Sequence, residues 1–351
     1  MRKKIKRALV KVVANLIPVK KWRVAFRNYF LKNPNIHDYY GRIYSPYYYP
    51  YPFVDGTPEI YNKKGERMEM YFIRDWHGAS DPYSLRNGFP PTHFLWDRYN
   101  FGLKTHFYVH NAMLETMGKP DRRYGMLLES AALVPEDYLI FEKHPKLAED
   151  FDAVFTYDAN TLGKVKCAKF FPHYASPWFG TAQGGGVPDE HAFERKTKGV
   201  SIVSSNKRMC SYHDYRISLA FQCRNEKLAD AFGTFDGGPM IKIADSLTDY
   251  RYSIAIENDI SPWFFTQKIT DCFLSMAIPI YFGASEIGRF FNTDGIINIK
   301  PGDDLRKILA MCDEKEYLAR LPAVLDNYRR VQEYRNMWDW LYNKYLRLPH
   351  A

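Results

Sequence analysis

Short apolar runs that alternate with helical segments are the feature that most limits how this chain can fold. The runs have the length of buried strands and lie at 68–73, 104–110, 124–129, 151–157, 169–172, 200–204, 252–257, 278–282 and 295–299. The clearest helical segments of the second half are 212–223, 266–275 and 303–311. Strands that alternate with helices predict parallel sheets covered by helices, so the sequence indicates the α/β class.

The length of the chain, 351 residues, suits two domains of ~150 residues each rather than one core. Gly184, Gly185 and Gly186, followed by Pro188, form the strongest linker signal. We therefore predict two Rossmann-like domains that face each other across a cleft, because ligands of such sheets bind beyond the carboxyl ends of the strands. The predicted parts are a tail at 1–37, a first domain at 38–183, a linker at 184–198, a second domain at 199–322 and a helix at 323–351.

The final segment carries one apolar stripe whose members step by three and four residues. They are Val331, Tyr334, Trp338, Leu341, Tyr345 and Leu348. This spacing predicts one continuous amphipathic helix that straps the two domains together, with docking on a membrane or on a second copy as the alternatives.

The positive charge is concentrated at the start of the chain. The net charge is +9, yet residues 1–37 carry eleven Lys and Arg and no acidic residue, so the rest of the chain has a net charge of −2. A nucleic-acid groove needs its positive charge on the globular part, and nucleic acid is therefore not an expected partner.

The basic tail also carries an apolar pattern at helical spacing. Its members before Pro18 are Ile5, Ala8, Leu9, Val12, Val13 and Leu16. The longest uncharged run there, 12–19, is far shorter than the ~20 residues that span a bilayer, and no cleavage site of a secretory leader follows it. The pattern predicts a helix that lies in the plane of an anionic membrane, or else a basic helix packed on its own domain.

The remaining composition bears on the compartment and on the aromatic content. Five cysteines without a C-x-x-C pair indicate neither zinc nor disulfides, and they favour a reducing compartment. We accordingly expect a cytoplasmic protein held peripherally at the membrane. Residues 39–53 are dense in aromatic rings but interrupted by prolines, which predicts an extended segment covering the core or a shelf for sugar rings.

Polar residues follow the predicted strand 252–257 and start the next helix. Glu257 and Asn258 stand at the end of the strand, and Thr266 is placed to cap the helix that contains Lys268. A helix N-terminus presents free N–H groups and a partial positive charge, to which an exposed Lys268 would add a full charge. The sequence therefore predicts a site for a phosphate-like anion.

Residues 198–300 resemble the donor-binding signature of glycosyltransferase family 10, the α-1,3/1,4-fucosyltransferases. The resemblance lies in Ile256-Glu257-Asn258, in Thr266-Gln267-Lys268, in Ile278-Pro279-Ile280-Tyr281-Phe282-Gly283, and in Ser204-Ser205-Asn206 followed by Arg216. It implies the GT-B fold, GDP-fucose as the donor and inversion at the anomeric centre. It also makes 199–322 the donor-binding domain and 38–183 the acceptor-side domain.

The resemblance assigns roles to individual residues of the donor site. Arg216 and Lys268 would neutralise the diphosphate, and Asn258 would hydrogen-bond the donor. Phe264 stands where the family often has a Tyr, and Gln267 replaces the family's Glu. The second change removes a negative charge, so another nucleotide-sugar donor stays open as an alternative.

An inverting transferase needs a base for the acceptor hydroxyl, and Glu129 is the candidate. It ends the apolar run 124–129, so its carboxylate should emerge at the carboxyl edge of the first sheet. The alternative is that Glu129 caps the following helix. We expect no metal and no cofactor. Asp150-Phe151-Asp152 precedes a strand and does not follow one, and His110, of the three histidines His93, His106 and His110, ends a predicted strand and is expected to line the acceptor side instead.

The sequence therefore predicts an inverting glycosyltransferase that moves fucose from GDP-fucose to a hydroxyl of a glycan acceptor. A catalytically silent glycan-binding protein is the alternative from another class, and the amide of Gln267 is the residue that favours it.

Overall fold

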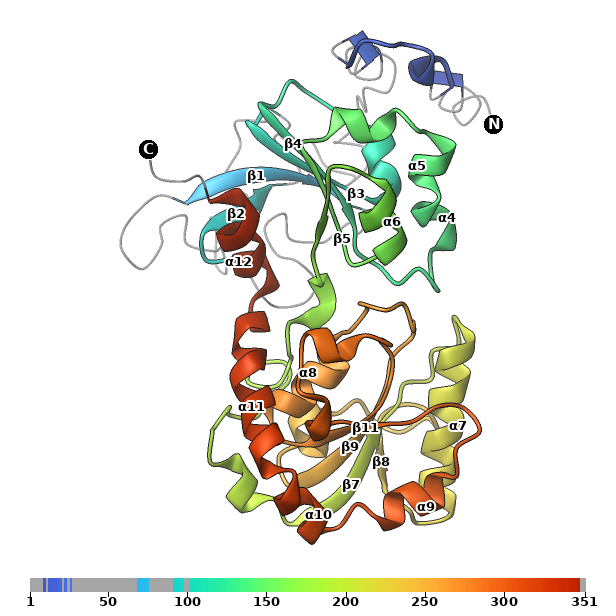
Figure 1. Ribbon diagram of the computed structural model, residues 1–351, viewed down its shortest axis with the longest axis vertical. Helices are drawn as coiled ribbons and strands as arrows, with labels where there is room; N and C mark the ends of the chain where they lie inside the picture. The colour runs from blue at the N-terminus through green and yellow to red at the C-terminus, as the bar shows by residue number, and fades with distance from the viewer. Residues whose placement is uncertain are drawn as a thin grey trace. The chain divides into compact units, whose positions relative to one another are not determined.

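The computed structural model describes residues 9–10, 12–20, 22–23, 26, 68–75, 91–97 and 102–347. The aromatic segment 39–53 lies outside these residues. The chain forms two compact units, both drawn in Figure 1. Unit 1 comprises Met1–Glu129, Val134–Phe171 and Leu341–Ala351, and unit 2 comprises Ser130–Leu133 and Pro172–Trp340.

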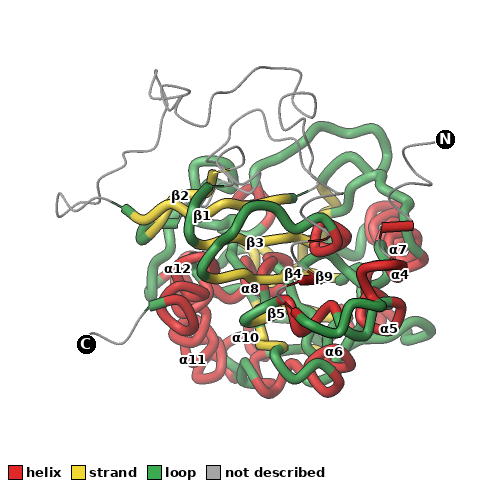
Figure 2. Tube along the Cα trace, turned by 90° about the horizontal axis from the view of Figure 1, so that it is seen from above, coloured by secondary structure: helices red, strands yellow, loops and turns green. Residues whose placement is uncertain are grey.

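Unit 1 is built on a parallel sheet of six strands in the order β2-β1-β3-β4-β5-β6, several of which Figure 2 shows lying side by side. The strands are β1 (Glu69–Arg74), β2 (Phe94–Asp97), β3 (Thr105–Val109), β4 (Arg122–Leu127), β5 (Ala153–Thr156) and β6 (Ala168–Phe170). The central strands are buried on both faces, which explains why their sequences are continuous apolar runs without an alternating pattern.

The two faces of this sheet bury different kinds of side chain. One face packs Phe72, Tyr108 and Val154 against Met113 and Ile140 of the helical layer. The other face is a chain of ring contacts formed by Tyr71, Phe94, Trp96, Phe107, Tyr124, Phe155 and Tyr345. These rings therefore form the core on one face of the sheet of unit 1.

The helical segments of unit 1 are short. They are η1 (His110–Leu114), α4 (Pro135–Tyr138), α5 (Ile140–Lys143), η2 (Leu147–Asp150) and α6 (Ala159–Lys164). The last of them begins at Asp158, whose carboxylate accepts from Thr161 N at 2.7 Å, an N-terminal cap of the usual kind.

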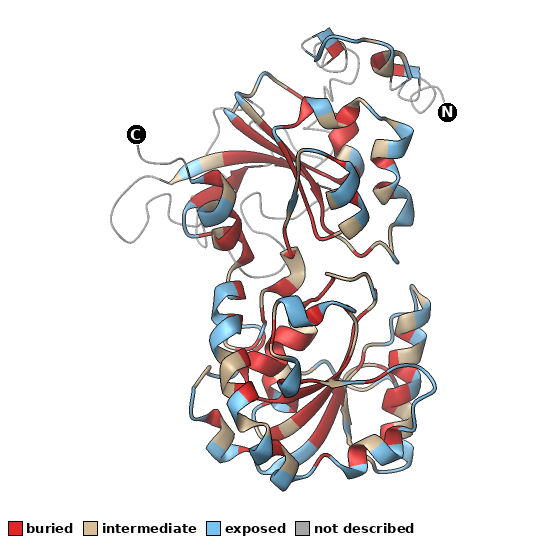
Figure 3. Ribbon diagram, in the orientation of Figure 1, coloured by how far each residue is buried: buried red, intermediate tan, exposed pale blue. Residues whose placement is uncertain are grey.

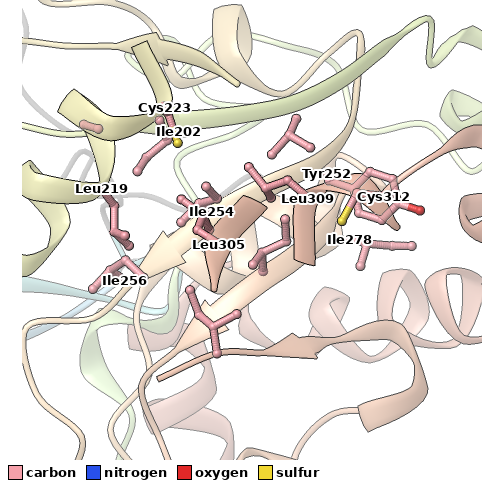
Figure 4. Close-up of a cluster of buried hydrophobic side chains, with 14 of the residues drawn as sticks. Ile202, Leu219, Cys223, Tyr252, Ile254, Ile256, Ile278, Leu305, Leu309 and Cys312 are labelled. Atoms are coloured by element: carbon pink, nitrogen blue, oxygen red, sulfur yellow. The ribbon is translucent and has the colours of Figure 1, made fainter. Parts of the chain in front are cut away.

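Unit 2 is built on a parallel sheet of five strands in the order β11-β10-β9-β7-β8. The strands are β7 (Lys198–Val203), β8 (Asp230–Phe232), β9 (Tyr250–Ile256), β10 (Ile278–Phe282) and β11 (Ile297–Asn298). Figure 4 shows part of its core, in which isoleucines of the strands meet leucines of the flanking helices and two cysteines. The labelled residues are Ile202, Leu219, Cys223, Tyr252, Ile254, Ile256, Ile278, Leu305, Leu309 and Cys312.

Longer helices flank this second sheet. They are α7 (Ser211–Asn225), α8 (Gln267–Leu274), α9 (Leu305–Ala310), α10 (Glu314–Ala319) and α11 (Leu321–Val331). The short helix α12 (Met337–Leu341) follows them in the chain, and its last residue belongs to unit 1. Single turns fill the connections at η3 (His173–Ala175), η4 (Ala192–Arg195), η5 (Ile243–Ser246), η6 (Ile287–Arg289), η7 (Thr293–Gly295) and η8 (Gln332–Tyr334). Helix α7 packs against β7 and β8, whereas α8 packs against β9, β10 and α11.

The predicted α/β class with two Rossmann-like units is confirmed. Strand β10 has the bounds that the sequence predicts, and β1, β3, β5, β7 and β9 lie within a few residues of theirs. The sequence pattern misses β2 and β8. The second of these has three residues, so it is too short to form a recognisable apolar run.

The glycine-rich run forms a folded turn within unit 2, where the sequence pattern suggests a linker. The division between the units falls at Phe171 and Pro172, and Thr181 bridges to Gly185. A Cβ on Gly184 would lie 2.0 Å from the carbonyl oxygen of Trp178, and Gly185 and Gly186 have positive φ angles. These glycines therefore permit a close backbone approach, which a sequence cannot distinguish from flexibility.

The C-terminal segment is interrupted, so the prediction of one continuous helix is wrong. Helix α11 ends in the turn η8, and a new helix, α12, continues into the π-helical turn η9 (Tyr342–Leu346). The break is at Asn336, whose side-chain oxygen accepts from Trp338 N at 3.1 Å and from Asp339 N at 3.3 Å. Tyr334, Trp338 and Leu341 of the apolar stripe are buried, so they do not offer a docking face.

Candidate functional site

The order of the strands in unit 2 creates a topological switch point between β7 and β9. From β7 the chain passes through α7 to β8 on one side, and from β9 it passes through α8 to β10 on the other. The connections diverge at this point, and ligands of parallel α/β sheets bind beyond the carboxyl ends of the strands at such a point. Ser204 and Ser205 follow β7 there, and Glu257 and Asn258 follow β9.

The helices α7 and α8 both begin at this edge of the sheet. Cys210 precedes α7, and its Sγ lies 3.6 Å from the carbonyl oxygen of Asn258. Thr266 caps α8 as the sequence predicts, with Oγ1 accepting from Lys268 N at 3.2 Å. Both helix starts add partial positive charge to the region.

Glu257 organises the start of α8. Its carboxylate is fully buried and accepts from Thr266 N at 2.8 Å and from Thr266 Oγ1 at 2.8 Å. Lys268 Nζ donates to the same carboxylate at 3.0 Å, and 23% of the Lys268 side chain is exposed. The expectation that Lys268 is a freely exposed residue is therefore wrong, because its ammonium is already paired with a buried acid.

Arg216 lies on α7, one turn into the helix, and is 7% exposed. Its Nη2 is 3.4 Å from Ser205 Oγ, whereas its Nε has no hydrogen-bond partner among the described residues. Asn258 Oδ1, also buried, has no partner among them either. A buried polar atom left unpaired costs about 1–3 kcal/mol, so a ligand that pairs both atoms gains that free energy.

The electrostatics of the site favour an anion. Burial, together with the nearby charges of Arg216 and Lys268, lowers the pKa of His213 to about 4. Its Nδ1 accepts from Met209 N at 3.1 Å, which fits a neutral ring. Burial also lowers the pKa of Arg216, against the attraction of Glu257. Two cations therefore face one carboxylate, and their field already repels a proton from His213.

His213 was missed by sequence reasoning. A histidine on the first turn of a helix gives no pattern of its own, and only the fold brings it within the field of Arg216 and Lys268.

The two remaining predicted donor residues lie at the start of α8. Gln267 is the first residue of the helix and is half-buried. Phe264 precedes the cap and is 2% exposed, so its ring packs inside unit 2. Their contact with a donor stays a prediction.

An open hollow of about 540 Å³ lies at the carboxyl ends of β10 and β11, beside the switch point. Residues 281–289 line one part of it, and Thr293, Asn298 and Ile299 line the rest. Gly283 joins this hollow to the site, because a Cβ there would lie 2.6 Å from Glu257 Cγ and 2.2 Å from Tyr281 Oη. The sequence predicts Gly283 only through the family resemblance.

Glu129 lies in unit 1, two residues beyond the end of β4, and is half-buried. Its backbone is held from three directions. Its N–H donates to His110 Nε2 at 3.0 Å, and its carbonyl accepts from the hydroxyls of Tyr138 and Tyr157. The residue is thus at the predicted edge of the sheet, and its function as a base stays a prediction.

His110 fixes this loop and is itself held by an acid. Its Nε2 accepts from both Leu128 N and Glu129 N, so its proton is on Nδ1, which lies 3.2 Å from Asp137 Oδ2. The backbone of His110 has φ 53°, a left-handed conformation that is rare outside glycine. Asp137 and His110 therefore position Glu129 through its main chain.

The described part of the chain contains no group of three or more His, Cys, Asp or Glu residues that could hold a metal ion. Asp150 accepts instead from Arg23 Nε at 3.1 Å, and Asp152 accepts from the N–H of Arg123 at 2.7 Å. Both carboxylates of the D-x-D motif thus have structural roles.

No family model and no curated protein matches the chain, whereas several solved structures are distantly similar to it. A crystal structure of an α1,3-fucosyltransferase with GDP is 14% identical, and the match covers 81% of this chain and 94% of that one with a TM-score of 0.49. A crystal structure of an α1,3-fucosyltransferase with GDP-fucose is 13% identical over 78% of this chain and 90% of that one, with a TM-score of 0.45. A crystal structure of TarM is 13% identical over 75% of this chain and 62% of that one, with a TM-score of 0.43.

Proposed function

We propose that the chain is a glycosyltransferase that holds the diphosphate of a nucleotide-sugar donor at the switch point of unit 2. The observation that carries the proposal is the pair of buried atoms without partners, Arg216 Nε and Asn258 Oδ1. The first is a donor and needs an anionic oxygen. The second is an acceptor and needs a hydroxyl or an amine. A nucleotide sugar offers both kinds of group, because its diphosphate supplies anionic oxygens and its nucleoside and sugar supply hydroxyls and amines.

The same residues serve the leaving group. When the bond between the sugar and the diphosphate breaks, negative charge grows on the diphosphate oxygens. Arg216, Lys268 and the start of α8 are fixed before the reaction, so they stabilise this charge without rearranging. Each such interaction contributes about 2.7–4 kcal/mol to the transition state in other enzymes. In this proposal the nucleoside occupies the hollow at β10 and β11.

The proposed acceptor is a hydroxyl group of a glycan, and Glu129 is the proposed base. A half-buried carboxylate with an immobilised main chain keeps its position while the hydroxyl loses its proton. GDP-fucose is the proposed donor on the strength of the signature around Asn258 and Lys268. Gln267 leaves an amide where the family has a carboxylate, so a related nucleotide sugar is the second candidate donor.

Calorimetry with GDP, UDP, pyrophosphate and guanosine tests the donor site. We expect GDP to bind more tightly than either pyrophosphate or guanosine, because only GDP joins an anionic diphosphate for Arg216 to the hydroxyl and amine groups of a nucleoside. The matched variants are Arg216→Met at the site and Arg306→Met at an exposed ion pair with Glu226 on the same unit. The first should lose GDP binding and the second should keep it.

Product formation with a panel of nucleotide sugars then identifies the donor. A protein that binds glycans but no nucleotide would overturn the proposal in favour of a silent glycan-binding protein.

Replacement of Glu129 by Gln separates binding from chemistry. The amide keeps the size of the side chain and loses its basicity, so transfer should fall by about 100-fold or more while GDP affinity stays unchanged. Single-turnover product formation measures the first quantity and calorimetry the second. Glu136→Gln, on an exposed carboxylate of α4, is the control. Near-normal transfer by the Glu129 variant would assign the base to another group.

A further inference from the structure

The start of the chain presents an apolar surface to solvent. Residues 9–10 and 12–15 are helical, and a second helical stretch includes residues 20, 22 and 23. Exposed apolar side chains recur along this part at steps of three and four residues. We call them the N-terminal apolar face, and they are Leu9 (63% exposed), Val12 (60%), Leu16 (75%), Val19 (42%) and Trp22 (65%).

Buried contacts on the opposite side determine which way this face points. Val10 and Ala14 are 5% and 1% exposed, and Asn15 Nδ2 is 2.8 Å from His144 Nδ1. Figure 3 shows buried and exposed segments alternating along the short helices near the N-terminus. The predicted alternative of a helix packed on its own domain therefore holds for one side of the helix only, and the other side remains uncovered.

Arg23 locks the second helical stretch in place. Its guanidinium is fully buried, with Nε 3.1 Å from Asp150 Oδ1 and Nη2 2.8 Å from Glu149 Oε2. Its Nη1 donates to the carbonyl of Ile17 at 3.0 Å, which closes the turn between the two helical stretches. A buried ion pair of this kind specifies an arrangement more than it stabilises the fold, and here it holds Trp22 outward.

The charge of the same segment identifies the partner. Of the eleven cationic residues in 1–37, Arg23 has acidic partners in unit 1, and the segment contains no acidic residue of its own. Lys20 is exposed next to the apolar face. An apolar stripe that includes a Trp, in a segment whose sequence is rich in cations, matches the interface of a bilayer that contains anionic lipids. A second copy of this chain would bring like charges together.

We infer that the N-terminal apolar face docks unit 1 on an anionic membrane surface, with Leu9, Leu16 and Trp22 inserted among the head groups. Among the described residues, no helix is both long enough and apolar enough to cross a bilayer. The attachment that we infer is peripheral, and it combines burial of apolar side chains with attraction to anionic lipids. This inference does not depend on the proposed sugar transfer.

Cosedimentation with vesicles of phosphatidylcholine, with and without phosphatidylglycerol, tests the inference on the full chain. We expect the protein to bind the anionic vesicles, to bind neutral vesicles weakly, and to be released as salt rises. The test variant is Leu9→Ser with Leu16→Ser and Trp22→Ser. The control is Val187→Ser with Met240→Ser and Met311→Ser, which changes three exposed apolar residues of unit 2.

The test variant should bind anionic vesicles about tenfold more weakly or worse, whereas the control should bind like the unchanged protein. Both should unfold at the unchanged temperature, because the altered side chains are exposed. Three results would each overturn the inference. They are a test variant that binds anionic vesicles as well as the unchanged protein, an unchanged protein that binds neutral and anionic vesicles equally, and an unchanged protein that binds no vesicles at low salt. If the unchanged protein and the control form a dimer, the test variant does not, and none of them binds vesicles, the inference is overturned and the face is a dimer interface.

Discussion

The ion pair between Lys268 and Glu257 is expected to affect both the stability of the fold and the binding of the diphosphate. Lys268→Met leaves the fully buried carboxylate of Glu257 without its cation. We expect a loss of about 1–3 kcal/mol in the free energy of unfolding, less than the ~3–5 kcal/mol of a fully buried pair because Lys268 is partly exposed. Glu257→Gln in the same chain removes the uncompensated charge and should restore most of the stability. Urea unfolding measures both effects.

Nucleotide binding distinguishes the two roles of Lys268. The double variant should remain defective in GDP binding, since the cation is still missing. Recovery of GDP affinity together with stability would mean that Lys268 acts only through the fold.

The pKa of His213 should change when the diphosphate binds. Its pKa is lowered to about 4 by burial and by the cations Arg216 and Lys268. A diphosphate offsets the cations, so the pKa of His213 should rise by about one unit or more when GDP binds. The complex then holds more protons than the free protein, and GDP affinity should increase as pH falls towards the free pKa.

Imidazole NMR signals followed across pH, with GDP and with guanosine, measure this shift. His213→Gln identifies the signal and should flatten the pH dependence of binding, whereas the exposed His191→Gln should not. A pKa that GDP leaves unchanged would place the anion elsewhere.

At the scale of elements, residues 184–186 form a tight turn in the structure, whereas the sequence suggests a linker, and substitutions distinguish the two. A Cβ at Gly184 would meet a backbone carbonyl at 2.0 Å, and backbone cannot move aside as a flexible side chain can. Gly184→Ala should therefore cost about 1–3 kcal/mol of stability. A linker glycine would tolerate the change.

Gly163→Ala is the matched control. Gly163 lies in helix α6 with nothing within 4 Å of the added methyl group, so alanine there should be neutral or stabilise by up to about 1 kcal/mol. Thermal and urea unfolding compare the two variants. Equal effects would show that residues 184–186 do not form the tight turn.

At the scale of the whole molecule, unit 2 contains every residue of the proposed diphosphate site. Most of it is one continuous stretch, Pro172–Trp340, with its own sheet and core. We expect a chain of residues 172–340 to fold cooperatively and to bind GDP, while lacking transferase activity because Glu129 is in unit 1. Circular dichroism and calorimetry check this, with Arg216→Met in the same fragment as the control. A folded fragment that ignores GDP would show that unit 1 supplies ligands to the nucleotide.

The sequence by itself determined the local and periodic features of this protein. Apolar runs report burial along the chain, so they predicted β1, β3, β10 and the α/β class. The cap at Thr266 was predicted for a similar reason, because a side chain that accepts from the backbone two residues later is a local interaction. The charge of the tail is a property of composition and needs no fold.

Only the tertiary structure decided what depends on residues that are distant in sequence. Lys268 is paired and not free because β9 places Glu257 under the start of α8. His213 has an altered pKa because two helices converge at one sheet edge, and Gly184 is packed because the carbonyl of Trp178 lies against it. The exposed face of the tail is likewise set by Arg23, which pairs with acids more than a hundred residues away. Partners of this kind leave no periodic signal, since the chain between them can have any length and composition.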